Sequence, residues 1–287
     1  MKKFFNYIKL MRPKHYLKNA LVFVPIMYSQ NLNDLPMLFS VFAAFVALCL
    51  IASGIYAVND IADAEKDAAH PANKYRPIAA GIISKPAAAG FAVFLFAAGF
   101  VIVLVFGNTL VLIFTASYAV LFLAYSVTLK HIAVIDCFCI AAGFVLRIYI
   151  GGAAMDIGEL VSEWLFLTIT AGSLFMAFGK RRGEMVRTDD KATARKVLGG
   201  YNLEFLNGII FSCAGVTAVF YALWAMTNAE FMIYTVPLVV FIICKYLLNI
   251  HCGKSYGDPV TVIFGDKMLV GAIIVFGALS LVFLYAA

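Results

Sequence analysis

The chain has 287 residues, of which 63% are hydrophobic and 13% are charged. Soluble domains carry roughly 45–50% apolar and about 25% charged residues, so this composition excludes a soluble globular protein and indicates a polytopic membrane protein. The formal net charge of +6 does not indicate a nucleic-acid partner, because positive charge in membrane proteins gathers in particular loops.

The N-terminal segment, residues 1–15, is amphipathic and basic. This pattern is typical of a helix that lies on the membrane surface, and it differs from that of a cleavable export signal. We therefore expect an interfacial helix at the start of the chain.

Apolar stretches long enough to cross a bilayer follow along the rest of the chain, since about 20 residues suffice. The first of them is short and contains Pro25. The sequence predicts an all-α fold, a bundle of nine transmembrane helices in one integral membrane domain, 1–287. The nine predicted spans are roughly 16–32, 37–58, 87–106, 109–128, 132–152, 161–179, 203–226, 231–249 and 268–286.

Charge is distributed unequally between the two sets of loops that nine spans create. One set, with the adjoining helix ends, holds 21 of the 22 Lys and Arg residues and includes the loops 59–86 and 180–202. The loops of the other set hold acidic residues and no Lys or Arg. Positively charged loops stay in the cytoplasm, which predicts a multi-pass protein of the inner membrane with its N-terminus inside and its C-terminus outside.

The second predicted span ends in an acidic motif, Asn-Asp-Ile-Ala-Asp-Ala-Glu-Lys-Asp, at residues 59–67. Its aspartates Asp60, Asp63 and Asp67 are three and four residues apart and fall on one face of a helix. Carboxylates in this number suit Mg²⁺, which usually bridges a few of them to substrate phosphates. We predict a magnesium–diphosphate site at the membrane surface; the alternative is a solvated acidic loop.

Cationic and polar residues follow the motif and recur at three other points on the same side of the membrane. A basic residue at one helix end is usually an interface anchor, but together these groups form a chamber with carboxylates for a metal and cations for several phosphates. They are Lys74 and Arg76 after the motif, Lys14 and Lys18 around the start of the first span, Tyr125, Lys130 and Asp136 around the turn between the fourth and fifth spans, and Lys180, Arg181, Arg182 and Glu184 after the sixth.

Arg147 and the six cysteines lie apart from this pattern. Arg147 is well inside the fifth span, where a charged residue normally faces the bundle interior, so it is either a substrate contact or part of a structural ion pair. The cysteines form no Cys-x-x-Cys pair and indicate neither a zinc site nor a disulfide framework.

The chain resembles the UbiA-type superfamily of intramembrane prenyltransferases along its whole length. Members carry Asn-Asp-x-x-Asp-x-x-x-Asp after the second helix, matched by Asn59 and the three aspartates, and a Tyr and Lys pair after the fourth, matched by Tyr125 and Lys130. They also have nine helices. Their second motif, Asp-x-x-x-Asp, is replaced here by Lys-Arg-Arg-Gly-Glu at 180–184, which weakens one metal-binding pole and adds positive charge.

This exchange resembles the branch of decaprenyl-phosphate phosphoribosyltransferases, as do the stretches at 12–19, 74–81 and 257–267. The resemblance implies a Mg²⁺-dependent glycosyltransferase of cell-wall biosynthesis. Such an enzyme transfers the 5-phosphoribosyl group of phosphoribosyl diphosphate to a polyprenyl phosphate and releases diphosphate.

These substrates and the charges of the site together suggest roles for individual residues. Metal ligands on the donor diphosphate are expected from Asp60, Asp63 and Asp67, and catalytic roles from Asp60, Asp63, Arg76 and Lys130. Substrate contacts are expected from Lys14, Lys18, Asn59, Lys74, Tyr125, Arg147, Lys180, Arg181 and Glu184. The acceptor phosphate is already anionic, so catalysis rests on positioning and electrostatics. The expected partners are the two substrates and the bilayer, without nucleic acid, and a homo-oligomer is left open.

Two other functions fit parts of the pattern. A prenyl diphosphate transferase with an aromatic or other small acceptor needs two metal-binding poles, and only Glu184 remains at the second. A transporter or channel shows charges and broken helices near the bilayer midplane, whereas polar residues gather here at one face.

Overall fold

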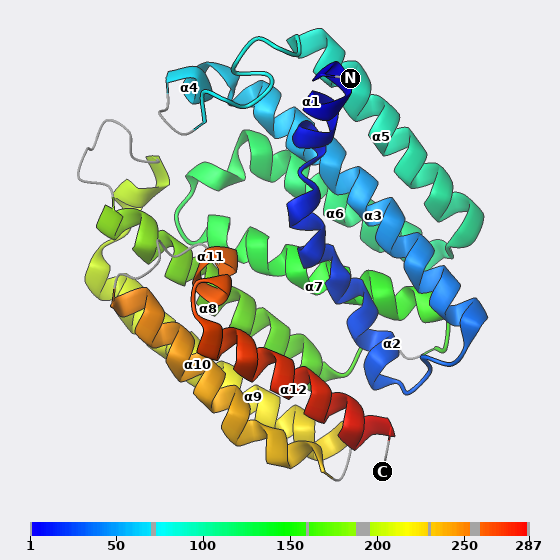
Figure 1. Ribbon diagram of the computed structural model, residues 1–287, viewed down its shortest axis with the longest axis vertical. Helices are drawn as coiled ribbons and strands as arrows, with labels where there is room; N and C mark the ends of the chain where they lie inside the picture. The colour runs from blue at the N-terminus through cyan, green and yellow to red at the C-terminus, as the bar shows by residue number, and fades with distance from the viewer. Residues whose placement is uncertain are drawn as a thin grey trace. The chain divides into compact units, whose positions relative to one another are not determined.

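The computed structural model describes residues 2–69, 73–158, 161–187, 196–228, 231–252 and 259–285. These ranges form α-helices and 3-10 helices and contain no strand, which confirms the all-α prediction (Figure 1). They pack as two compact units: unit 1 comprises 1–130 and 146–160, and unit 2 comprises 131–145 and 161–287. The assignment of 1–287 to one membrane domain stays a prediction.

Unit 1 is built around the long helix α3. Its helices begin where the sequence supplies a cap: the side chains of Asp34, Ser84 and Asn108 each accept a hydrogen bond from a backbone N–H three residues on, at the starts of α3, α5 and α6. The elements are α1 (Lys2–Met11), η1 (Pro13–Phe23), α2 (Val24–Tyr28), α3 (Leu35–Ala62), α4 (Ala64–Ala69), α5 (Lys85–Phe106), α6 (Thr109–Val127), the start of η2 (Leu129–His131) and the second half of α7 (Ile135–Met155).

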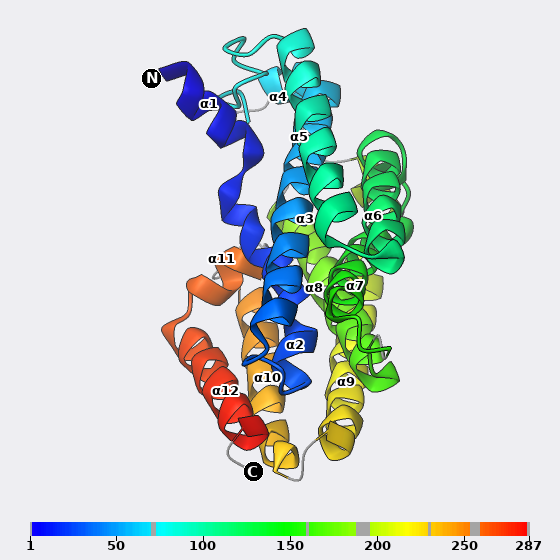
Figure 2. The ribbon, with the colours of Figure 1, turned by 90° about the vertical axis from the view of Figure 1, so that its right-hand side faces the viewer.

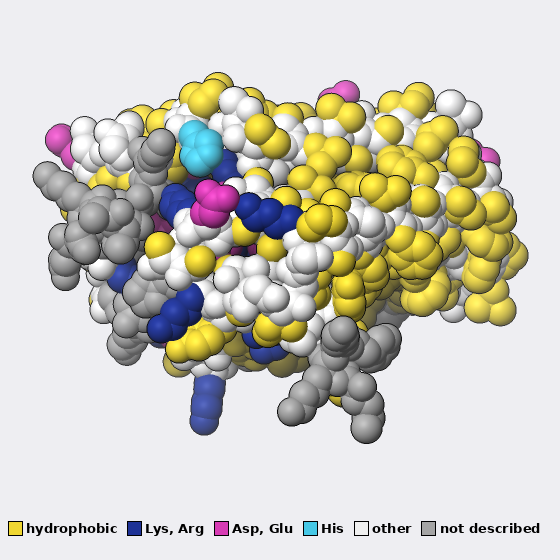
Figure 3. All heavy atoms as spheres, turned by 90° about the horizontal axis from the view of Figure 1, so that it is seen from above, with side chains coloured by type: hydrophobic (Ala, Val, Ile, Leu, Met, Phe, Trp, Pro, Cys, Tyr) yellow, Lys and Arg dark blue, Asp and Glu magenta, His cyan; other side chains and the backbone are white. Residues whose placement is uncertain are grey.

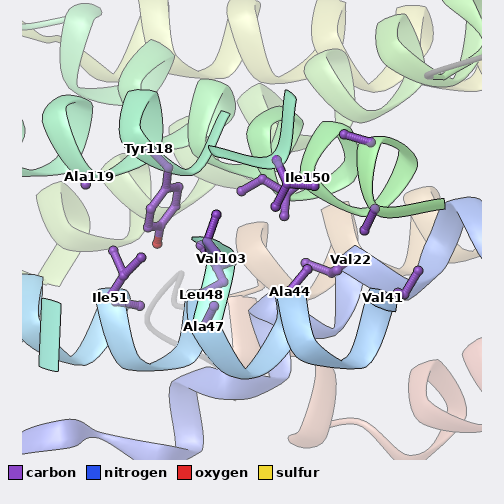
Figure 4. Close-up of a cluster of buried hydrophobic side chains, with 14 of the residues drawn as sticks. Val22, Val41, Ala44, Ala47, Leu48, Ile51, Val103, Tyr118, Ala119 and Ile150 are labelled. Carbon is purple, nitrogen blue, oxygen red and sulfur yellow. The ribbon is translucent and has the colours of Figure 1, made fainter. Parts of the chain in front are cut away.

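Close packing against α5 and α6 holds α3 in place. A Cβ atom at Gly99 of α5 would lie 2.6 Å from Ile51 Cγ1 and 3.0 Å from the carbonyl oxygen of Ala47, both on α3, so a larger residue would push the helices apart. Figures 1 and 2 show α3 and α5 side by side. Tyr118 of α6 and Ile150 of α7 belong to the buried core and point toward α3 (Figure 4).

The first predicted span, 16–32, does not form one long α-helix. Pro25 lacks the N–H that a helix interior needs, and the segment folds as η1 followed by the five-residue α2, with Pro25 in the first turn of α2. A 3-10 helix rises about 2.0 Å per residue and an α-helix about 1.5 Å, so the two elements have a combined length of about 30 Å, the thickness of a bilayer's hydrocarbon core. The carbonyl of Val22 lies against Gly151 of α7, where an added Cβ would be 2.0 Å from its oxygen.

Unit 2 is organised around α8 and α9, which pack along each other. Phe178, Leu206 and Tyr246 from α8, α9 and α10 are part of its buried core. The elements are the first half of α7, α8 (Glu163–Arg187), η3 (Lys196–Gly200), α9 (Leu203–Asn228), η4 (Met232–Thr235), α10 (Val236–His251), α11 (Pro259–Phe264) and α12 (Lys267–Tyr285).

The predicted loop 180–202 is helical as far as Arg187. Helix α8 continues through Lys, Arg, Glu and Met, because these residues have high helix propensity. The acidic and basic residues at 180–184 are therefore fixed on a helix. Residues 188–195 of the predicted loop lie outside the described residues.

Seven helical stretches in the described ranges are long and apolar enough to cross a bilayer: α3, α5, α6, α7, α9, η4 with α10, and α12. The predicted spans 16–32 and 161–179 are not among them; the latter corresponds to α8, whose last turns carry many charges. Large apolar side chains face outward, among them Val93 and Val120, each 68% exposed. Hydrophobic side chains also cover much of the face in Figure 3. Such a surface suits lipid, and the chain is a multi-pass membrane protein.

Candidate functional site

The acidic motif lies at the junction of α3 and α4. Asp60 is in the last turn of α3 and is 3% exposed, whereas Asp63 ends that helix and donates its N–H to the carbonyl of Asn59 at 2.9 Å. The N–H of Asp67 in α4 donates to the carbonyl of Asp63 at 2.8 Å, so helical hydrogen bonding resumes at once. The predicted single acidic face is divided, because Asp60 and Asp67 share one cation and Asp63 binds another.

Arg76 joins Asp60 and Asp67. Its Nη1 atom lies 3.4 Å from Oδ1 of Asp60 and 2.5 Å from Oδ2 of Asp67. A turn holds the arginine in place: its N–H donates to the carbonyl of Asn73 at 2.9 Å, and the Asn73 amide donates to Oδ1 of Asp67 at 2.9 Å. The structure thus brings Arg76 to the motif, where its expected role in catalysis stays a prediction.

Lys130, in η2, binds the remaining aspartate. Its Nζ donates to both carboxylate oxygens of Asp63 at 2.8 Å and to Oδ1 of Asn59 at 3.2 Å. The side chains of Lys130 and Asp63 are only 12% and 26% exposed. Two groups that the sequence places 67 residues apart are therefore in direct contact.

Arg12 belongs to this site although it was not among the predicted site residues. It lies between α1 and η1 with a φ of +55°, a conformation that side-chain-bearing residues seldom adopt. Its guanidinium donates to Oδ1 of Asp60 and lies 5.1 Å from the centre of the Tyr56 ring. The Ser53 hydroxyl shares its proton between the carbonyls of Cys49 at 2.7 Å and Met11 at 3.1 Å, and the second contact holds the adjoining backbone. Two signals were present in the sequence, the basic N-terminal segment and the resemblance of the stretch 12–19, but neither marked a contact with Asp60, which lies 48 residues away.

Three carboxylates and three cations balance one another at this site: Asp60, Asp63 and Asp67 with Arg12, Arg76 and Lys130. In this arrangement no three His, Cys, Asp or Glu side chains of the described ranges lie close enough to hold a metal ion. The donor set still fits Mg²⁺, which binds carboxylate and amide oxygens, and the motif supplies oxygen ligands only. A metal would have to replace arginine or lysine at these oxygens.

The other predicted substrate residues of unit 1 differ in exposure. Lys14 and Lys74 are exposed, whereas Lys18 and Tyr125 are half-buried. The Tyr125 ring meets the Phe122 ring edge-on, with 6.0 Å between their centres. Figure 3 shows Lys and Arg side chains gathered beside Asp and Glu on one part of a face. Contacts of these four residues with substrate stay predictions.

Arg147 lies in the interior of unit 1 and is 4% exposed. Its Nε donates to Oδ1 of Asn19 at 2.9 Å, and its Nη2 donates to the Tyr118 hydroxyl at 2.8 Å. Its guanidinium carbon lies 4.9 Å from the centre of the Tyr118 ring. These contacts join α7 to η1 and α6, which gives Arg147 a structural part; a substrate contact by the same residue stays a prediction.

A second buried charged cluster lies in unit 2, where the sequence predicted cations for phosphate. Arg181 is 1% exposed, and its Nε donates to Oδ2 of Asp136 at 2.5 Å. Its Nη1 donates to Oε2 of Glu184 at 2.6 Å. The Tyr201 hydroxyl donates to Oδ1 of Asp136 at 2.6 Å and accepts the N–H of Val134 at 2.5 Å. Arg181 is therefore held by carboxylates of its own unit, and its predicted phosphate contact stays a prediction.

Further hydrogen bonds hold the residues around this cluster. Val134 has a φ of +68°, which is rare for a β-branched residue, and the hydrogen bond to Tyr201 helps to hold it. Burial and the hydrogen bond to Asp136 raise the pKa of Tyr201 above its usual value, so the phenol stays protonated and can donate at neutral pH. Arg182 donates to Oδ1 of Asn207 at 2.6 Å, whereas Lys180 is half-buried.

Comparison with known proteins shows the family to which this chain belongs. The profile of the UbiA prenyltransferase family matches residues 20–264. The chain belongs to the UbiA prenyltransferase family. Among its UbiA relatives, the decaprenyl-phosphate phosphoribosyltransferase of Mycolicibacterium smegmatis is 34% identical over 91% of this chain and 87% of the relative. The protein of that name from Mycobacterium tuberculosis is 30% identical over 94% of both chains.

Solved structures agree on the UbiA fold. A UbiA homolog from Archaeoglobus fulgidus bound to GPP and Mg²⁺ has a TM-score of 0.74, with 98% of each chain covered and 17% identity. At that identity the likeness establishes the fold. The family assignment confirms the resemblance that the aspartate motif and the Tyr125–Lys130 pair predicted.

Proposed function

We propose that this protein transfers the 5-phosphoribosyl group from phosphoribosyl diphosphate to a polyprenyl phosphate and releases diphosphate. The observation that carries the proposal is the 30–34% identity, over more than nine-tenths of the chain, to proteins named decaprenyl-phosphate phosphoribosyltransferase. The charge of the site supports the same substrates, because both donor and acceptor bring phosphate groups that cations must hold.

The donor diphosphate is assigned to the acidic motif. Arg76 and Lys130, two of the three cations that contact the motif, have N–H groups that suit phosphate oxygens. Asp60, Asp63 and Asp67, with the amide oxygen of Asn59, would hold Mg²⁺; the magnesium-bound relative from Archaeoglobus fulgidus supports this choice of metal. When bound, the ion neutralises charge that develops on the leaving diphosphate.

The chemistry is a substitution at the anomeric carbon of ribose. An oxygen of the acceptor phosphate forms a bond to C1, and the bond between C1 and the diphosphate oxygen breaks, so that diphosphate leaves with the electron pair. Because the acceptor oxygen is anionic, no side chain has to remove a proton. Arg76 and Lys130 contribute by holding the diphosphate in line and by stabilising its added charge.

The placement in the membrane is part of the proposal. Nine crossings require η1 with α2, and α8, in addition to the seven helical stretches that qualify by length and apolarity. The combined length of η1 and α2, about 30 Å, is sufficient for one crossing. The excess of Lys and Arg in one set of loops then places the acidic motif and the N-terminus on the cytoplasmic side.

A prenyl diphosphate transferase with a small aromatic acceptor is the second candidate. It would need a second metal pole, and Glu184 at that position is bound to Arg181, which also binds Asp136. Lys180 also stands where that pole would need its first carboxylate, which favours the phosphoribosyl donor.

The test is direct. Purified protein in lipid nanodiscs is incubated with phosphoribosyl diphosphate, Mg²⁺ and a polyprenyl phosphate, and the lipid fraction is examined by mass spectrometry. We expect a lipid heavier by one phosphoribosyl group, and none in EDTA. A parallel reaction with a prenyl diphosphate and 4-hydroxybenzoate should give no product. Prenylation of the ring without phosphoribosyl transfer would replace this proposal with the second candidate.

A further inference from the structure

Every carboxylate of the acidic motif is occupied by a cation of the protein. Both oxygens of Asp63 accept from Lys130, Oδ2 of Asp67 accepts from Arg76, and Oδ1 of Asp60 accepts from Arg12. A metal ion that arrives alone has to displace one of these cations and then remain beside its unbalanced charge. That repulsion is large where the groups are shielded from water.

The situation changes when a diphosphate arrives with the metal. A magnesium diphosphate carries net negative charge, so a displaced guanidinium gains phosphate oxygens in place of the carboxylate. Metal and diphosphate then favour each other's binding, which is a coupling free energy between two ligands.

Arg12 is the cation best placed for this exchange. Its backbone is fixed by its left-handed conformation and by the hydrogen bond from Ser53 to Met11. Its guanidinium also rests on the Tyr56 ring, a contact that can persist when the bond to Asp60 is given up. The side chain is 21% exposed whereas that of Asp60 is 3% exposed, so the arginine is the partner of the pair that solvent and a ligand can reach.

We propose that Arg12 is a further substrate-binding residue, which pairs with Asp60 in the empty site and transfers to a diphosphate oxygen when the metal takes its place. The proposal rests on the assignment of the donor diphosphate to this motif. Arg12 then lowers the affinity of the site for a metal ion alone and raises its affinity for diphosphate.

The experiment measures the two effects separately, with Mn²⁺ and inorganic pyrophosphate as probes. Electron paramagnetic resonance follows free Mn²⁺ during titration without diphosphate, and calorimetry follows pyrophosphate binding at saturating Mg²⁺. In Arg12→Gln we expect Mn²⁺ affinity to rise at least about fivefold, the lower range of such couplings. Pyrophosphate affinity should fall at least about tenfold, because a charge-assisted hydrogen bond is lost.

Two further variants serve as controls. Arg12→Lys keeps the charge and should leave Mn²⁺ affinity near that of the wild type. Lys85→Gln breaks the exposed pair with Glu65 and should change neither affinity. An Arg12→Gln protein that binds Mn²⁺ no more tightly than the wild type, or that loses affinity for both probes, would overturn the proposal.

The outcome is independent of the reaction catalysed. Pyrophosphate contains no ribose, so opposite changes in the two affinities can be observed even if phosphoribosyl transfer fails. Conversely, transfer with an unchanged Mn²⁺ affinity in Arg12→Gln would keep the function and remove the role of Arg12.

Discussion

Replacement of Arg181 by methionine tests whether this arginine supports the fold or binds substrate. The substitution keeps a long unbranched side chain and removes the guanidinium from Asp136, which is fully buried, and from Glu184. Asp136 then keeps the Tyr201 hydroxyl as a hydrogen-bond donor but loses its cation. Breaking a buried ion pair in this way costs about 3–5 kcal/mol, so Arg181→Met should lower the free energy of unfolding by that amount.

The two tryptophans allow this loss of stability to be measured in unit 2. Trp164 and Trp224 both belong to unit 2, so intrinsic fluorescence during denaturation reports the unit that contains Arg181. A second substitution, Asp136→Leu, should recover part of the loss in the Arg181→Met background, because an apolar pair replaces a lone buried charge.

Lys85→Met is the control for a pair that solvent already screens; since this pair lies in unit 1, its unfolding is followed by circular dichroism and should be unchanged. The opposite result would be an Arg181→Met protein that unfolds within about 1 kcal/mol of the wild type while its KM for phosphoribosyl diphosphate rises at least about tenfold. Arg181 would then act on the substrate.

Four further outcomes follow from the same contacts. Asp60→Asn should abolish turnover with the fold retained, and EDTA should do the same until Mg²⁺ is restored; full activity of the variant in metal-free buffer would exclude the metal site. Lys130→Gln removes a charge-assisted contact worth about 1.5–3 kcal/mol, and steady-state kinetics should show a KM for the donor raised at least about tenfold. Lys180→Asp should eliminate phosphoribosyl transfer without creating aromatic prenylation, as product analysis would show, since it puts a carboxylate where phosphate is expected. A hydrogen bond from Lys245 lowers the pKa of Asp266 from its usual 3.8 to about 2; wild type should therefore exceed Asp266→Asn in unfolding midpoint above pH 4 and lose that advantage as pH falls toward 2.

The sequence predicted the helical class and the acidic motif because both depend on local patterns. Apolar stretches of sufficient length mark helices in a membrane, and the motif from Asn59 to Asp67 is visible in nine consecutive residues. The family resemblance gave Lys130 a role in the same site as this motif, but its direct contact with Asp63 was not predicted, because 67 residues separate the two in sequence.

Other features depend on contacts that no local pattern encodes. The pairing of Arg12 with Asp60 depends on how η1 packs along α3, and nothing in the spacing of the two residues marks it. The sequence suggested an open position for Arg181, yet helix α8 extends past it and turns its guanidinium into the unit. The first predicted span was apolar enough for a helix, but its single proline, Pro25, was given too little weight against that apolarity.

The eleven residues of η1 are more extended as a 3-10 helix than they would be as an α-helix. Runs of 3-10 helix beyond three or four residues are uncommon, and the same residues wound as an α-helix would be shorter by about 5.5 Å, roughly one α-helical pitch. One end of η1 is anchored where Val22 meets Gly151, and the other adjoins Arg12. A change of η1 from a 3-10 helix to an α-helix would therefore move Arg12 away from Asp60. The packing of the other helices of unit 1 would stay as it is.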